Sequence, residues 1–152
     1  MGEDPVLGQP YDYAVSRLGE AGGDWDQLPV PLQTLLIVEA AQGMIDTGGL
    51  EYFYEADFPN NPPYASFVDA YRRIGAEEAA SCIEASALMF PFAEPQLFAP
   101  LREVWLEKIR LERDHEFKRL SRRICGDESV WRKLADYVTA HRRDFSPGPN
   151  AG

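Results

Sequence analysis

The stretch LQTLLIVEAAQGMID, residues 32–46, constrains the fold more than any other part of the chain, because it is apolar around nearly its whole circumference. Glu39, Gln42 and Asp46 follow one another at i, i+3 and i+7, so they form a single polar stripe on an otherwise apolar helix. A helix of this kind is stable only when other elements cover it. The sequence therefore predicts a central buried helix around which the remaining chain folds.

The rest of the chain also carries helical rather than strand patterns. No segment alternates apolar and polar residues cleanly, and the β-branched residues are scattered. The sequence predicts an all-α fold, and the other expected helices cover residues 11–18, 50–56, 64–74, 76–90, 97–125 and 128–143. The penultimate helix would be long and charged, with Leu101, Trp105 and Ile109 facing inward.

One domain is expected. A chain of 152 residues can bury a core without help from a metal or a disulfide. We expect a single compact multi-helix domain over residues 11–145, preceded by a flexible segment at 1–10 and followed by a disordered tail at 146–152.

Three glycines are predicted to shape the turns. Gly48 and Gly49 supply the positive-φ freedom that ends the central helix before the short aromatic segment at 50–56. Gly75 ends the helix at 64–74. We expect all three to have a structural role.

The acidic charge lies in the first half of the chain. The net charge is −10, and residues 1–70 contain twelve acids against one base, whereas residues 71–152 contain thirteen acids against fourteen bases. This charge opposes direct binding to nucleic acid or to anionic lipid. No apolar run approaches the roughly 18 residues of a membrane span, so no membrane interaction is expected.

The cysteines and the first residues of the sequence indicate the cellular compartment of the protein. Cys82 and Cys125 both fall in segments that read as helix, and MGEDPVLG has neither the basic nor the apolar region of a secretory signal. We therefore expect a reduced, cytoplasmic protein.

The candidate site is acidic. It comprises Glu39, Asp46, Glu51, Glu55 and Asp57, which lie in a 54-residue stretch, residues 18–71, that contains no Lys, Arg or His. In a helix at 50–56, Glu51 and Glu55 lie side by side and repel each other by a few tenths of a kcal/mol. Such an array can imitate a phosphate track and recruit a cationic partner.

A structural explanation of the same acids stays open. They form a solvated face, or they meet cations in three dimensions, supplied by Arg72, Arg73 or the C-terminal helices.

Signals for catalysis are few. Glu112 and His115 form one E-x-x-H pair, half of a di-metal helix motif, but no second copy occurs. Neither cysteine has a histidine close in sequence, and no G-x-S-x-G or phosphate-binding loop is present. The sequence predicts no catalytic residue, no metal site and no cofactor. A hydrolase whose catalytic residues meet only in the fold remains an alternative.

Two motifs resemble a bacterial domain family, most of whose members have no assigned activity. They are Gly48-Gly49-Leu50-Glu51-Tyr52-Phe53-Tyr54 and Ala70-Tyr71-Arg72-Arg73-Ile74-Gly75-Ala76. The closing pattern at Leu134, Tyr137, His141 and Phe145 is similar to the C-terminal helix of that family. Thr47 and Leu50 stand where the family usually has Asn and Phe.

That family includes a DNA-mimic protein, an all-helical acidic dimer whose carboxylates take the place of phosphates and capture a DNA-binding regulator. The resemblance implies a helical fold and a non-enzymatic interaction role. The expected partner is a basic protein such as a DNA-binding regulator or nucleoid protein. A helical interaction or immunity-type protein with a partner that does not bind DNA is the alternative. A homodimer is a further possibility, in which Arg119, Arg122 and Arg123 accept the acidic half of a second subunit.

Overall fold

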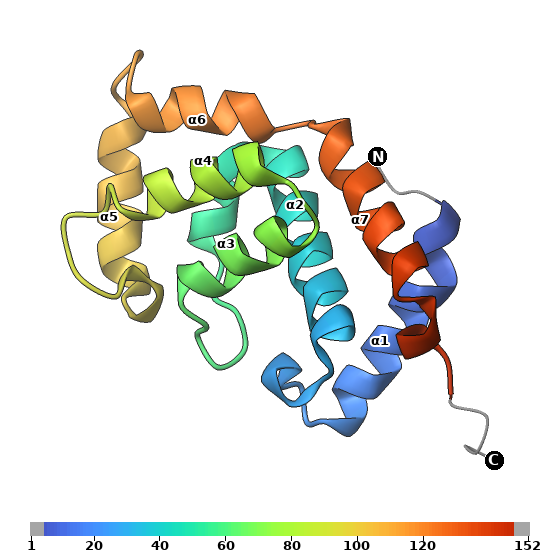
Figure 1. The fold of residues 1–152 in the computed structure, drawn as a ribbon. Coiled ribbons are helices and arrows are strands. Elements are labelled where there is room, and N and C mark those ends of the chain that lie inside the picture. Colours follow the sequence, from blue (N-terminus) through green and yellow to red (C-terminus); the bar gives the residue numbers. More distant parts are fainter. Residues whose placement is uncertain (1–4, 148–152) are drawn as a thin grey trace.

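The computed structural model describes residues 5–147, and these contain seven α-helices, four short 3₁₀ helices and no strand (Figure 1). The predicted all-α fold is confirmed. The α-helices are α1 (Gly8–Glu20), α2 (Val30–Glu55), α3 (Tyr64–Arg73), α4 (Glu77–Ala87), α5 (Ala99–Arg110), α6 (Glu116–Ile124) and α7 (Glu128–Ala140). The 3₁₀ helices are η1 (Pro5–Leu7), η2 (Trp25–Gln27), η3 (Pro95–Leu97) and η4 (Arg142–Phe145).

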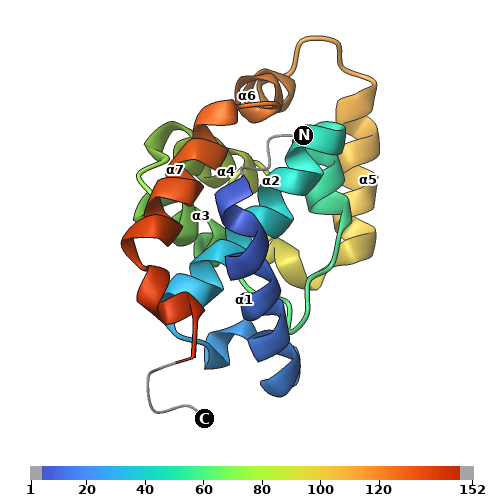
Figure 2. The same ribbon diagram turned by 90° about the vertical axis from the view of Figure 1, so that its right-hand side faces the viewer.

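The predicted central helix is α2, and the other helices surround it (Figures 1 and 2). The pair α3 and α4 packs on one side, α1 and α7 cover another, and α6 crosses one end. Helix α5 lies at the edge of the molecule against the second half of α2. Thirteen residues of α2 are buried, as its apolar circumference requires.

Aromatic rings fill the core between α2, α3 and the loops that follow α2 and α4. The ring of Phe53 contacts those of Tyr54, Phe58, Tyr64 and Phe67 at centroid separations of 4.9–5.8 Å. Tyr54 Oη meets Ser86 Oγ at 2.6 Å and donates to the carbonyl of Ile83 at 3.1 Å. These contacts fix the end of α2, and therefore the acidic residues interleaved with the rings.

Helix α2 changes direction at Gly48 and Gly49, which have non-helical backbone angles. Gly49 has φ = 73°, a left-handed conformation that favours glycine. A Cβ on Gly49 would lie 2.5 Å from Ser121 Oγ of α6, and one on Gly48 would lie 2.7 Å from Cβ of Tyr52. The break expected from the sequence is present, but α2 does not end there and continues beyond the two glycines to Glu55.

Gly75 also has a positive φ, 82°, and follows Ile74, the C-cap of α3. It allows the chain to reverse into α4, as the sequence predicted.

The predicted single helix over 97–125 is wrong. Helix α5 ends at Arg110 and α6 begins at Glu116. His115 separates them, since its Nδ1 accepts the main-chain N–H of Phe117 at 3.0 Å and so acts as an N-terminal cap. The expected inward position of Leu101 is also wrong, because 49% of its surface is exposed.

The N-terminal helix begins earlier than predicted, at Gly8 rather than near residue 11. The 3₁₀ helix η1 precedes it, and Leu7 is buried in the core. Residues 1–4 of the expected flexible segment and 148–152 of the expected tail lie outside the described residues.

Candidate functional site

Glu51 and Glu55 lie one turn apart in the last two turns of α2, and both meet Arg110 at the end of α5. Arg110 Nη2 donates to Glu55 Oε1 at 2.6 Å, and Arg110 Nε donates to Glu51 Oε1. The remaining guanidinium nitrogen reaches Glu103 Oε1 at 3.3 Å. We call Glu51, Glu55, Glu103 and Arg110 the Arg110 cluster.

The Arg110 cluster is acidic on balance and partly exposed. Its three carboxylates share one guanidinium, so the four side chains carry a net charge of −2. Partial desolvation lowers the pKa of Arg110, but hydrogen bonds to Glu103 and Glu51 outweigh it, so the pKa is raised above its ordinary value. The arginine therefore stays charged and holds the three carboxylates in place.

Asp57 has a different partner, the buried side chain of Arg102. Only 1% of the Arg102 surface is exposed. Arg102 Nη2 donates to Asp57 Oδ1 at 2.6 Å, while 59% of the Asp57 side chain is exposed. The other donors of Arg102 reach the main-chain oxygens of Tyr54, Ala56, Pro95 and Gln96 at 2.8–3.3 Å. This arginine ties the end of α2 to η3 and to the start of α5.

Asp46 is a structural acceptor. Its Oδ1 accepts from Gln42 Nε2 at 2.8 Å and from the main-chain N–H of Gly126 at 2.7 Å, and its Oδ2 accepts from Trp131 Nε1 at 2.8 Å. These bonds join α2 to α7 and to the turn after α6. Glu39 is half-buried on α2 and interacts within the fold.

The structure therefore brings only part of the predicted acidic site together. Glu51 and Glu55 meet at the Arg110 cluster, and Asp57 follows them on the neighbouring loop. The cations that meet these three acids are Arg102 and Arg110, and both lie on α5. For these acids the structure therefore agrees with the structural explanation in which later helices of the chain supply the cations. Arg72 instead pairs with Glu77 and Glu84, while Arg73 Nε donates to Thr34 Oγ1. Sequence analysis did not assign Glu103, Arg102 or Arg110 to the site.

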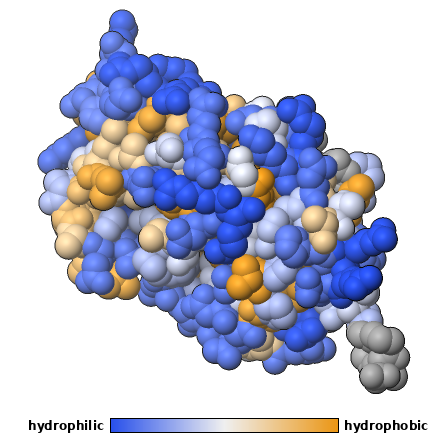
Figure 3. Space-filling view, in the orientation of Figure 1, coloured by the Kyte–Doolittle hydropathy of each residue, from blue (hydrophilic) through white to orange (hydrophobic). Residues whose placement is uncertain are grey.

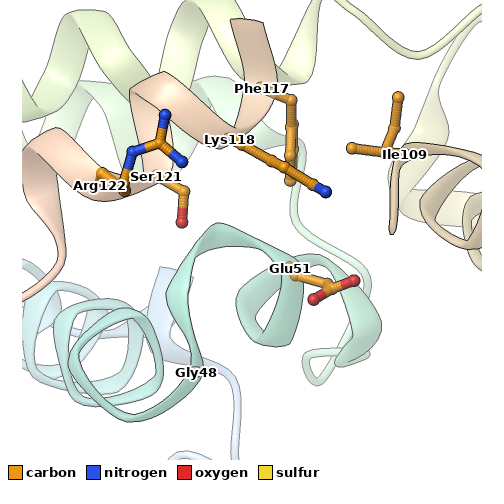
Figure 4. A pocket seen from close by; sticks show the side chains of 7 residues that line it. All are labelled: Gly48, Glu51, Ile109, Phe117, Lys118, Ser121 and Arg122. Atoms are coloured by element: carbon orange, nitrogen blue, oxygen red, sulfur yellow. The ribbon is translucent and has the colours of Figure 1, made fainter. Parts of the chain in front are cut away.

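A small surface pocket adjoins the Arg110 cluster at the kink of α2 (Figure 4). Its volume is about 180 Å³, and its lining residues are Gly48, Glu51, Ile109, Phe117, Lys118, Ser121 and Arg122. Lys118 Nζ donates to the main-chain oxygen of Arg110 at 3.2 Å. This volume is below the roughly 300–1,000 Å³ of ordinary small-molecule sites.

The histidines and cysteines make structural contacts. His115 caps α6, and its ring packs edge-on against Trp105 at 6.1 Å. His141 stacks on Tyr137 with ring centroids 4.2 Å apart. Cys82 is buried, and desolvation raises the pKa of its thiol. Cys125 is exposed, with Sγ 3.8 Å from the main-chain oxygen of Asp46.

Neither a metal site nor a membrane span is found among residues 5–147. This part of the chain contains no group of three or more His, Cys, Asp or Glu side chains placed to hold a metal ion. In the same range, no helix has both the length and the apolar character needed to cross a bilayer.

The fold and the Arg110 cluster define an acidic, all-helical domain with a carboxylate-rich surface. The chain belongs to the DMP19-like protein family, whose model matches residues 26–141, from η2 to the end of α7. This match confirms the resemblance seen in the glycine-aromatic and Ile-Gly-Ala motifs. Searches of curated proteins and of solved structures gave no match.

Proposed function

We propose that this protein binds the basic surface of another protein, of the kind that a DNA-binding protein presents to DNA, and that the Arg110 cluster is the centre of the site. One observation carries the proposal: Glu51, Glu55 and Glu103 surround a single guanidinium on the molecular surface and leave two negative charges. Membership in the DMP19-like family, which includes a DNA-mimic protein, and the net charge of −10 support it.

The geometry suits a cationic partner for two reasons. Coulomb attraction from uncompensated surface carboxylates accelerates association with a basic protein. The hydrogen bonds to Arg110 also restrict the glutamate rotamers before binding, so less side-chain entropy is lost when the complex forms. The first contribution depends on the excess of carboxylates over arginine, and the second depends on the hydrogen bond that each glutamate accepts from Arg110.

The proposal is tested with the variant Glu51→Gln/Glu55→Gln/Glu103→Gln, which removes three charges at nearly constant shape. The control is Asp12→Asn/Asp69→Asn/Asp136→Asn, which removes three exposed charges from other helices. Each protein is immobilised and used to capture partners from bacterial lysate at low and at physiological salt, with and without DNA as a competitor. We expect a basic protein that binds the wild type and the control, is released by DNA, and is lost with the glutamine variant.

Two results would contradict the proposal. If the glutamine variant and the control lose the partner equally, only total charge matters and the Arg110 cluster is not the site. If the captured protein is insensitive to salt and to DNA, the partner belongs to the alternative class that does not bind DNA.

A further inference from the structure

Helix α5 carries apolar side chains on its outer face and an arginine on its inner face. Leu101 and Val104 lie on α5 and are 49% and 54% exposed, while Leu97 ends the preceding η3 and is 48% exposed. Phe98 adjoins them and is also exposed. We call these four residues the outer stripe. The inward position next to Leu101 is held by Arg102.

This arrangement is unusual for the outer face of a surface helix. Single exposed leucines are ordinary, but four exposed apolar side chains within eight consecutive residues are typical of a binding surface. In Figure 3, apolar residues gather on the side of the molecule where Figure 1 places α5.

One flank of the outer stripe is acidic. Glu103 and Glu107 lie one turn apart on α5, on the side toward Arg110, and Glu103 belongs to the Arg110 cluster. The stripe and the cluster therefore adjoin, so a partner that covers the stripe also meets Glu51 and Glu55 of α2. A complementary surface needs an apolar row with cations along one side of it.

We propose that the outer stripe and the Arg110 cluster form one docking surface for a basic amphipathic helix of the partner protein. The apolar face of that helix covers Leu101 and Val104 of α5 and the adjoining Leu97 of η3. Its Lys or Arg residues on one flank lie over Glu103, Glu107 and the cluster. This inference rests on the proposed function and adds to it the secondary structure and the apolar content of the partner surface.

The test uses two synthetic peptides of identical composition and the full-length protein. One peptide is helical, with leucines on one face and lysines and arginines along a flank. In the other, the same residues are shuffled so that no apolar face forms. Binding is measured by fluorescence anisotropy at physiological salt. We expect the amphipathic peptide to bind at least about tenfold more tightly, a difference that burial of one additional leucine is enough to produce.

Two variants separate the apolar from the charged contribution. Leu101→Ser/Val104→Ser removes half-exposed apolar groups, and Val15→Ser/Val30→Ser is the control, because these valines are 41% and 50% exposed on α1 and α2. We expect the first variant to bind both peptides equally and the control to keep the tenfold preference. Circular dichroism and the melting temperature check that each variant is folded.

Three outcomes overturn the inference. If the wild type binds both peptides equally and Glu51→Gln/Glu55→Gln/Glu103→Gln weakens both, the site is purely electrostatic, and the proposed function survives alone. If neither peptide binds, this inference fails, and the lysate capture with the glutamine variant decides the proposed function separately. If light scattering shows a dimer that Leu101→Ser/Val104→Ser dissociates while the amphipathic peptide does not compete, the occupant of the stripe is a second copy of this chain.

Discussion

At the scale of single residues, Arg102 contributes most clearly to the structure. It is a buried cation with five hydrogen-bonded acceptors, four of them main-chain oxygens. Its role is to satisfy carbonyl groups at the end of α2 and in η3 that the helices leave without donors. Asp57 balances its charge from a largely exposed position, so the pair differs from a buried ion pair in which both partners are desolvated.

Replacement of Arg102 by Met should therefore destabilise the protein strongly. Loss of the guanidinium leaves buried carbonyl oxygens without donors, and we expect a decrease of about 2–4 kcal/mol in the free energy of unfolding. Asp57→Asn should cost less than about 1 kcal/mol, because its side chain is exposed and the amide oxygen can still accept a hydrogen bond. Urea denaturation measures both, and an Arg102→Met protein as stable as the wild type would refute this role.

At the scale of elements, the kink in α2 and the break between α5 and α6 decide where the acidic residues lie. The kink turns the segment that carries Glu51 and Glu55 toward α5. It is held from outside the helix, since Ser121 Oγ of α6 accepts the main-chain N–H of Leu50 at 2.9 Å. Ser121 therefore takes the place of a carbonyl acceptor that the helix lacks at this point.

Gly49→Ala should lower stability by about 1–3 kcal/mol, because an alanine is strained at φ = 73° and its Cβ would approach Ser121 Oγ. Gly43→Ala serves as the control, because Gly43 lies within α2 and an added Cβ meets nothing within 4 Å. That change should be neutral or stabilising by up to about 1 kcal/mol. Equal melting temperatures for the two variants would contradict the argument.

The sequence determines the existence of α2 and its break more strongly than the ends of the later helices. A segment that is apolar on all sides and is followed by two glycines has few possible structures other than a buried helix that breaks at the glycines. Between Arg110 and Glu116, by contrast, charged residues continue the helical spacing, and the break depends on the cap formed by His115. The arginines of the acidic site could not be predicted, because Arg110 is 59 residues from Glu51 and Arg102 is 45 residues from Asp57. Only the packing of α5 on α2 brings them together.

At the scale of the whole molecule, folding places the acidic first half of the chain against arginines of the second. Glu51, Glu55 and Asp57 meet α5 in this way. The charge asymmetry of the sequence is therefore partly neutralised in the structure. The remaining excess of carboxylates stays on the surface.

The buried tyrosines should limit stability in alkali. Burial raises the pKa of Tyr64 from 10.0 to about 12, and it also raises the pKa values of Tyr54 and Tyr71. Below pH 10 both states keep these protons, but above it the unfolded chain releases them while the folded protein retains them, so stability falls as the pH rises. The loss reaches about 1.4 kcal/mol per pH unit for each tyrosine.

Denaturation followed between pH 9 and pH 12 by circular dichroism and tyrosinate absorbance tests this dependence. The tyrosines should ionise together with unfolding, and Tyr64→Phe should reduce the slope. Ionisation of all seven tyrosines near pH 10 in a protein that stays folded would contradict the assigned burial.

The bond from Leu50 to Ser121 also has a kinetic consequence. An amide proton exchanges with deuterium when its own acceptor moves away, and the acceptor of the Leu50 proton belongs to α6 rather than to α2. Exchange at Leu50 therefore measures how often α6 separates from the kink, while α2 itself remains wound. If α6 shifts when a partner binds, this one amide within the central helix will report the shift before its neighbours do.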